Sequence, residues 1–319
     1  MADAPSATPA ASDAVLTAEH LAQLTSLEAR ARLVADGLLV GHHRSRRFGS
    51  SSEFAEHKVY APGDDLRRMD WKTYARKNRY YVRRYEEETH LSAFLVVDAS
   101  HSMAYAGGAK GKFTASKFDA ARIAIAGVAW ALQHKSDAAG LSLLYDDGVH
   151  KELPPSARQD QLRQLLHELD QAKPKGTTVL QQQLQRAVER VRKKSLVVVC
   201  SDFLDVGDDI LQPLAVLRRR GCDVVVLHLM HRDEVEFPFE GVVLFEDLEG
   251  DREVQVDAGG VKKAYLDEMQ KHCDHLQQQC EAFDLRYHRM LSDEDLVAHL
   301  RQALAMAPSG QRLLHEGGT

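Results

Sequence analysis

The stretch Leu91-Ser-Ala-Phe-Leu-Val-Val-Asp-Ala-Ser-His-Ser102 decides the fold class of this chain. Residues 93–97 form an apolar run that has the length of one buried strand. The run ends directly in Asp98, and Ser100 and Ser102 follow at alternate positions. Because ligands of open α/β sheets bind beyond the carboxyl ends of the strands, this order predicts a first strand that leads straight into a binding loop.

Downstream of this stretch, short apolar runs alternate with amphipathic segments. Such alternation predicts an α/β fold, a doubly wound and mostly parallel sheet flanked by helices. Two hairpins interrupt it, one after the Asp146-Asp147-Gly148 turn and one within 237–256. The further strands are expected at 140–144, 196–200, 223–229 and 285–290, and the helices at 112–134, 157–169, 179–193, 209–220, 261–283 and 293–305.

The chain divides into four parts by composition. With 319 residues, 44% hydrophobic and 28% charged, it reads as a globular protein with room for one domain and a large appendage. We expect a disordered tail over 1–16, a helical and basic segment over 17–90, the α/β domain over 91–306 and a flexible tail over 307–319. Thr17 is expected to cap the first helix, and residues 41–85 match neither a periodic helix nor a plain strand.

Several classes of protein are excluded by composition. No apolar run reaches the ~18 residues of a transmembrane helix, so no transmembrane segment is expected. The first residues lack the basic leader and apolar segment of a secretion signal. Four cysteines are too few for a disulfide framework, so we expect a cytoplasmic protein.

Oxygen-bearing side chains follow three of the expected elements. Besides Asp98, Ser100 and Ser102, the loop before the 179–193 helix offers Thr177, and the 196–200 strand leads into Asp202. These five donors carry two formal negative charges, which suits Mg²⁺ and also Mn²⁺. Ser and Asp are ordinary turn residues after a strand, so the first motif alone is weak evidence; the order of all five residues carries the prediction.

The same five positions resemble the metal-ion-dependent adhesion site of von Willebrand factor A domains. That pattern is Asp-x-Ser-x-Ser, then Thr in a Gly-Thr turn, then Asp after a hydrophobic strand. Thr178 competes for the fourth position, and Thr177 is preferred because it directly follows Gly176. The resemblance implies a Mg²⁺-dependent protein-interaction module in which the metal bridges to an acidic side chain of the partner. Such domains are usually not enzymes.

The segment upstream of the first strand resembles the bacterial domain-of-unknown-function 58 family. The match rests on Tyr60-Ala-Pro-Gly-Asp-Asp-Leu-Arg-Arg-Met-Asp-Trp71, on Ala75-Arg76 and on Tyr85-Glu-Glu-Glu88, and Gly49 and Glu53-Phe54 fit its beginning. Many members begin with two membrane helices, and this sequence shows none, which favours a soluble form.

Family resemblance also implies a partner, a MoxR-type AAA+ ATPase. Such pairs are similar to chaperone-like systems that remodel or mature other proteins. This chain contains no Gly-x-x-x-x-Gly-Lys-Ser/Thr loop, so ATP hydrolysis is expected to belong to the partner. The predicted role is that of an adaptor.

An enzymatic function is the first alternative. Asp98 and Asp202 could position a metal-bound water for phosphoester hydrolysis, with His101 as the obvious candidate for a general base. Such hydrolysis usually needs further carboxylates, which the expected crevice does not supply. We therefore name no catalytic residue.

Nucleic-acid binding is the second alternative. Residues 44–84 contain twelve Lys or Arg against five Asp or Glu, and Tyr74, Tyr80 and Tyr81 lie among the charges. The whole chain is nevertheless acidic, with a net charge of −6, and Glu86–Glu88 follow closely. Docking of an acidic protein, or an internal match to the acidic domain, is therefore preferred over nucleic acid.

Two smaller clusters are interpreted as structural. Asp70 is expected to cap a helix, with Trp71 packed on the sheet. Asp64, Asp65 and Asp70 could form a second metal site, but the basic residues between them favour ion pairing instead. His272, Cys273, His275 and Cys280 lack the close spacing of a structural zinc site, so the cysteines are expected in the core.

Overall fold

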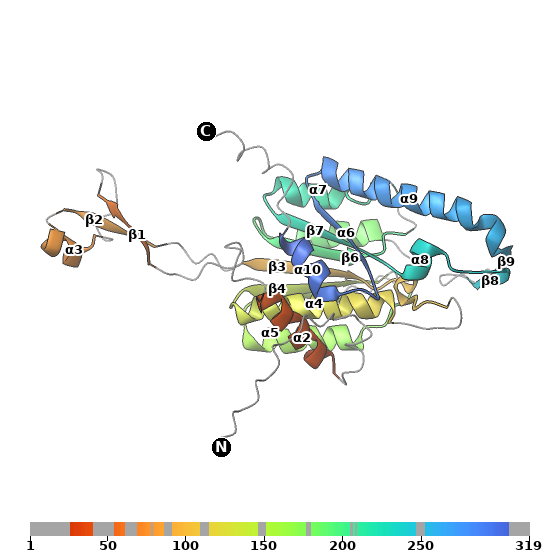
Figure 1. Ribbon diagram of the computed structural model, residues 1–319. Coiled ribbons are helices and arrows are strands. Elements are labelled where there is room, and N and C mark those ends of the chain that lie inside the picture. Colours follow the sequence, from red (N-terminus) through yellow and green to blue (C-terminus); the bar gives the residue numbers. More distant parts are fainter. Residues whose placement is uncertain are drawn as a thin grey trace, which may run out of the picture.

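Within the described part of the chain, six strands form the central sheet (Figure 1). The computed structural model describes residues 26–40, 54–60, 69–77, 79–85, 91–108, 115–145, 151–176, 180–204, 207, 209–246 and 253–305, without the side chains of 54–58, 72, 75, 77 and 82–85. The strand order is β10-β7-β6-β3-β4-β5. Neighbouring strands run parallel except β4 and β5, which are antiparallel. The strands are β3 (Ser92–Asp98), β4 (Ala138–Leu144), β5 (Lys151–Ser156), β6 (Leu196–Ser201), β7 (Asp223–Met230) and β10 (Arg286–Leu291).

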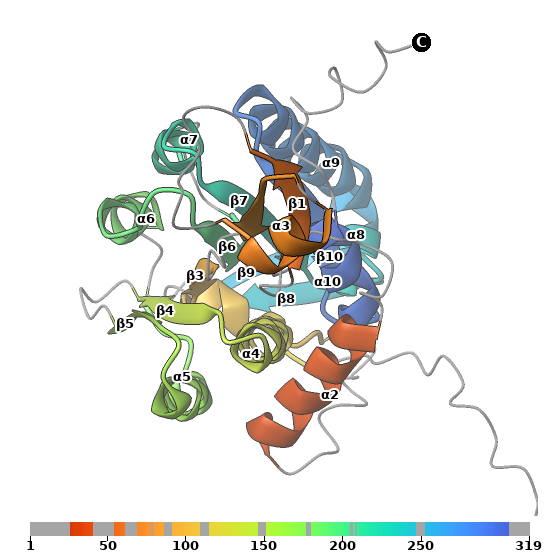
Figure 2. The ribbon, with the colours of Figure 1, turned by 90° about the vertical axis from the view of Figure 1, so that its left-hand side faces the viewer.

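Helices cover both faces of this sheet (Figure 2). Helices α2 (Leu27–Val40), α4 (Lys117–His134), α5 (Gln159–Gln171) and α10 (Leu296–Ala305) bury their apolar sides in one cluster. On the opposite face, α6 (Leu180–Glu189), α7 (Gln212–Arg219) and α9 (Ala258–Ala282) form the second cluster. Strands covered on both faces need near-continuous apolar sequence, which β6 and β7 have. The predicted fold class is confirmed.

The direction in which the chain winds changes beside β3. From β3 the chain moves outward through β4 to the edge strand β5, and it then crosses back to place β6 on the other side of β3. The carboxyl ends of β3 and β6 therefore flank the switch point of the sheet, where open α/β folds bind ligands. Asp98 and Asp202 lie at these two ends.

Helix α2 belongs to the same hydrophobic core as the sheet, although composition groups it with the N-terminal segment. Val34 of α2 packs so closely on Gly127 of α4 that a Cβ added at Gly127 would lie 2.3 Å from Val34 Cγ1. The hydroxyl of Ser26 accepts the amide hydrogen of Ala29 at 3.2 Å at the start of α2. Thr17, the expected cap, lies outside the described residues.

The segment before the sheet contains two strands that the sequence did not predict, together with the short helix expected after Asp70. Strands β1 (Phe54–Val59) and β2 (Tyr81–Tyr85) pair antiparallel, and α3 (Trp71–Lys77) lies between them in sequence. Asp70 Oδ1 accepts the amide hydrogen of Thr73 at 3.1 Å, which confirms the predicted cap. The expected packing of Trp71 on the sheet is wrong, because this side chain is 63% exposed and meets Tyr74 edge-on.

Other elements differ from the expectations in detail. Helix α4 begins at Lys117 and not near 112, because Ser116 and Asp119 form a reciprocal capping box. Helix α8 (Arg232–Glu236) was not expected. Strands β8 (Val242–Glu246) and β9 (Glu253–Asp257) form the second expected hairpin. Cys273 and Cys280 are buried, which confirms their assignment to the core.

We expect Gly127→Ala to lower the free energy of unfolding by roughly 1–3 kcal/mol, because the new methyl group overpacks the contact with Val34. Urea denaturation measures the change. Gly259→Ala in α9 is the control, since its nearest neighbour would be Asp257 Oδ1 at 3.7 Å. Val34→Ala should restore part of the lost stability in the double variant. A Gly127→Ala protein as stable as the original would contradict the packing of α2 on α4.

Candidate functional site

Two loops from the switch point of the sheet meet at Asp98. Its Oδ1 accepts the amide hydrogen of Ser100 at 2.9 Å, so the carboxylate is held by its own loop. Its Oδ2 accepts the hydroxyl hydrogen of Ser201 at 2.7 Å, so it is also held from the end of β6. The Ser201 hydroxyl in turn accepts the amide hydrogen of Phe203 at 3.0 Å. The structure thus brings together the Asp98 loop and the Ser201-Asp202 loop, as the sequence predicts.

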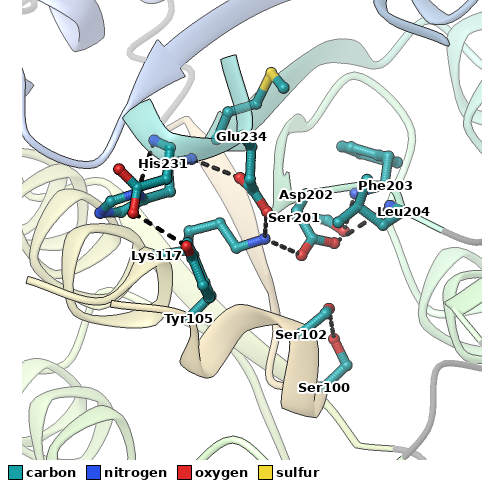
Figure 3. Close-up of polar contacts among 12 residues, drawn as sticks. Ser100, Ser102, Tyr105, Lys117, Ser201, Asp202, Phe203, Leu204, His231 and Glu234 are labelled. Atoms are coloured by element: carbon teal, nitrogen blue, oxygen red, sulfur yellow. Dashed lines mark hydrogen bonds and ion pairs between the residues drawn. The ribbon is translucent and has the colours of Figure 1, made fainter. Parts of the chain in front are cut away.

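The two serines of the Asp-x-Ser-x-Ser motif complete this group. Ser100 Oγ and Ser102 Oγ lie 3.0 Å apart (Figure 3). The Ser100 side chain acts to lower the pKa of Asp98, and the Ser102 side chain acts to lower that of Asp202, so each hydroxyl lies beside a carboxylate. Four of the five predicted ligands therefore lie in one group at the carboxyl ends of β3 and β6. Thr177, the fifth, and its competitor Thr178 lie outside the described residues.

A buried lysine that the sequence analysis missed contacts this group. Lys117, the first residue of α4, places its Nζ 2.7 Å from Asp202 Oδ2 and 2.6 Å from Glu234 Oε1 (Figure 3). The lysine side chain is fully buried. Removing one partner of a buried ion pair leaves an uncompensated charge, so these contacts tie α4, β6 and α8 together.

The geometry of α8 aims Glu234 at the lysine. Glu234 Oε2 accepts the backbone amide hydrogen of His231 at 2.6 Å, while His231 Nδ1 accepts the amide hydrogen of Asp233 at 3.1 Å. This is a capping box in which histidine replaces the usual serine or threonine. With Oε2 occupied by the cap, Oε1 remains for the ammonium of Lys117.

Helix α8 is also attached to the loop that follows the predicted metal motif. Asp233 Oδ2 accepts hydrogen bonds from the Tyr105 hydroxyl at 3.1 Å and the Gly108 amide at 3.2 Å. The Tyr105 ring meets His231 edge-on, with centroids 5.0 Å apart. Consecutive carboxylates of α8 thus contact the two ends of the 105–117 stretch, whose residues 109–114 lie outside the described part.

Burial and charge set the protonation of the site. Burial and the nearby charge of Asp202 raise the pKa of Asp98 to about 6, so it is ionised at pH 7. Burial alone would raise the pKa of Asp202, but Lys117 and the hydrogen bonds hold it below its usual value. Burial alone would likewise lower the pKa of Lys117, but the two carboxylates together hold it above its usual value. The ammonium therefore stays charged.

The donor set fits a small divalent cation. Oxygen atoms of Asp98, Ser100, Ser102 and Asp202 converge, and hard oxygen donors suit Mg²⁺. The group contains three carboxylates and one ammonium, those of Asp98, Asp202, Glu234 and Lys117. Its net formal charge is therefore −2, which a divalent ion would neutralise. Within the described residues, no three His, Cys, Asp or Glu side chains form a metal-binding cluster, so any such site depends on the serine hydroxyls.

Behind Asp202 lies a buried histidine of β7. His228 Nδ1 is 2.8 Å from the Tyr287 hydroxyl, and its ring meets Phe203 edge-on. Burial, with the neighbouring His272, lowers the pKa of His228 to about 3. The ring is therefore neutral, and a positive charge cannot readily form on this side of Asp202.

A pocket of ≈ 360 Å³ is lined partly by lysines, and one of them, Lys175, is hydrogen-bonded through its backbone to the Asp98 loop. The amide of Lys175 donates to the Ala99 carbonyl oxygen at 3.0 Å, and Ala99 itself donates to the Leu144 carbonyl oxygen. Lys175 Nζ lies over the ring of Tyr145, 5.3 Å from its centroid. The lining residues are Tyr145, Lys151, Glu168, Gln171, Ala172, Lys173 and Lys175.

Sequence reasoning missed Lys117 and Glu234 for different reasons. Lys117 follows a serine at the start of an amphipathic helix, which is the position of an exposed residue in most helices. Glu234 belongs to His231-Arg-Asp-Glu234, whose first and fourth residues have capping-box spacing. That spacing could have predicted α8, but neither signal places the two side chains against Asp202.

Comparison with known proteins identifies the family. The chain belongs to the family described as protein of unknown function DUF58, whose model matches residues 56–275. The uncharacterized protein Rv1480 of Mycobacterium tuberculosis is 28% identical over 242 residues, 74% of each chain, and the uncharacterized protein Mb1516 of Mycobacterium bovis matches equally. The resemblance to this family that the sequence predicts is confirmed.

Two solved structures from Bacteroides species match part of the chain. The conserved hypothetical protein BatB of Bacteroides thetaiotaomicron is 15% identical with a TM-score of 0.43 and covers 67% of this chain and 97% of its own. An aerotolerance-related membrane protein of Bacteroides fragilis is 16% identical with a TM-score of 0.43 and covers 67% and 96%. In the part of this chain that the structure describes, no helix has the length and apolarity that crossing a bilayer requires.

We expect the free energy of unfolding to fall by about 2 kcal/mol between pH 7 and pH 5 through His228 alone. In this range a histidine of the unfolded chain, with a pKa near 6.5, binds a proton, whereas the buried His228 does not. The stabilisation is present above pH 6.5 and is lost as the pH falls towards 3. His228→Asn should flatten this slope, and urea denaturation at several pH values measures it. The exposed His134→Asn should keep the original slope; an unchanged slope in His228→Asn would contradict the assignment.

Proposed function

We propose that this protein is a non-enzymatic, Mg²⁺-dependent protein-interaction module of the von Willebrand factor A type, serving as an adaptor for a MoxR-type AAA+ ATPase in remodelling or maturing other proteins. The observation that carries the proposal is the group of oxygens from Asp98, Ser100, Ser102 and Asp202 at the carboxyl ends of β3 and β6. It lies at the switch point of the sheet, where this class of fold binds ligands.

When bound, the cation supplies an open coordination position that a carboxylate of the partner can occupy. The chain's own residues prepare that position. Ser201 and the Ser100 amide fix Asp98, and the Leu204 amide donates to Asp202 Oδ1 at 3.3 Å. Both carboxylates are buried, so they are held in place before a ligand arrives.

The lysine-lined pocket supports an acidic partner. Lys173 and Lys175 are exposed, while the third lysine, Lys151, is paired with Glu168 at 2.8 Å. Lys175, which lines the pocket, is hydrogen-bonded through its backbone to Ala99, between two of the proposed ligands. An acidic segment whose carboxylate reaches the cation would therefore meet complementary charge beside it.

We expect Asp98→Ala and Asp202→Ala to lose Mg²⁺ binding in isothermal titration, because each removes an anionic ligand from the buried set. The exposed Asp267→Ala on α9 should bind Mg²⁺ like the original protein. Unchanged Mg²⁺ affinity in both site variants would refute the proposal. Turnover of phosphomonoesters or phosphodiesters with Mn²⁺ that disappears in Asp98→Ala would favour the hydrolase alternative instead.

We expect a MoxR-type ATPase from the genome that encodes this chain to bind in Mg²⁺ and to lose at least about tenfold in affinity in EDTA, an effect of about 1.4 kcal/mol. Biolayer interferometry with the purified proteins measures this. Lys173→Glu with Lys175→Glu should weaken binding without changing Mg²⁺ affinity greatly, whereas Lys263→Glu on α9 should not weaken it. Equal binding with and without Mg²⁺ would exclude a metal bridge.

A further inference from the structure

Lys117 occupies a position that is unfavourable for a cation in three ways. It is fully buried, it lies in the first turn of α4, where the helix dipole is positive, and it loses side-chain freedom. Asp202 and Glu234 offset these costs.

Asp202 is shared between the two arrangements. Its Oδ2 is 2.7 Å from the ammonium of Lys117, and Asp202 directly follows Ser201, whose hydroxyl binds Asp98 of the proposed metal motif. A divalent cation bound by Asp202 would lie close to the ammonium and repel it. The cation and Lys117 therefore compete for the same carboxylate.

Glu234 supplies a second partner for the lysine. Its Oε2 is fixed by the His231 amide, and its Oε1 is 2.6 Å from Lys117 Nζ. The ammonium can thus move away from Asp202 while it stays paired. Without Glu234, such a movement would leave a buried unpaired charge, which is strongly unfavourable.

We propose that Lys117 competes with the cation for Asp202 and thereby sets the affinity and charge selectivity of the site. When a divalent ion binds Asp202, Glu234 holds the ammonium. A monovalent ion carries no more charge than the ammonium that it would displace, so its attraction to Asp202 is no stronger than that of Lys117. A divalent ion brings twice that charge. The inference rests on the proposed Mg²⁺ site and adds a residue that the site's ligand pattern does not contain.

The test compares Mg²⁺ and Na⁺ titrations of the full chain with those of Lys117→Met and Lys117→Gln. The glutamine keeps a hydrogen-bond donor for Asp202 and Glu234, so it remains informative if the methionine variant does not unfold cooperatively. Competition predicts Mg²⁺ binding at least about tenfold tighter in either folded variant. Lys175→Met is the control, because it removes the same charge from a residue whose backbone is hydrogen-bonded to Ala99 but which forms no ion pair with Asp202. It should change Mg²⁺ affinity less than about threefold.

A second measurement uses the original protein. The ¹⁵N signal of the Lys117 ammonium, assigned by its absence in Lys117→Gln, should shift over the same Mg²⁺ concentrations that the calorimeter reports. NaCl at equal ionic strength should leave it in place. A signal that does not move as Mg²⁺ saturates the site would overturn the competition.

The outcomes separate this inference from the proposed function. If the original chain binds Mg²⁺, Asp98→Ala does not, and the folded Lys117 variants bind no more tightly than the original, Lys117 is no competitor although the metal site stands. If Lys117→Gln and Lys175→Met gain Mg²⁺ affinity equally, the gain comes from the lower positive charge near the site and not from the pairing with Asp202. That result would also overturn the competition. If neither the original chain nor the Lys117 variants bind Mg²⁺, both proposals fail.

Discussion

The ammonium of Lys117, held between Asp202 and Glu234, is the interaction on which the geometry of the candidate site depends. It joins the start of α4, the end of β6 and the short helix α8, which lie far apart in the sequence. All three groups are removed from bulk water to a large extent, so the attraction between them is weakly screened. A charge deleted here would leave its partners buried and unpaired, which is why each residue constrains the others.

Helix α8 has a larger structural role than its five residues suggest. Glu234 points to Lys117, while the adjacent Asp233 accepts hydrogen bonds from Tyr105 and Gly108. The helix leads into the β8–β9 hairpin, whose exposed apolar side chains include Val242 and Leu244.

The oxygen group at the switch point and the lysine-lined pocket occupy one edge of the sheet. Ala99 connects them, because its backbone pairs with Leu144 on one side and with Lys175 on the other. An acidic ligand and a divalent cation attract each other, so a surface that offers both a cation site and positive side chains favours the same class of partner. This physical match is the reason for preferring an interaction module to a catalytic site.

The sequence by itself determined the elements of the sheet and the convergence of Asp98, Ser100, Ser102 and Asp202, because apolar periodicity locates the strands and parallel strands end at a common edge. Tertiary structure decided what surrounds those oxygens. Nothing in the spacing of residues 117, 202 and 234 shows that one ammonium joins two carboxylates, since the contact spans separate elements. Likewise, Asp70 caps the helix as predicted, but the next residue, Trp71, is exposed. Local sequence signals determine where a helix starts and not which of its side chains are buried.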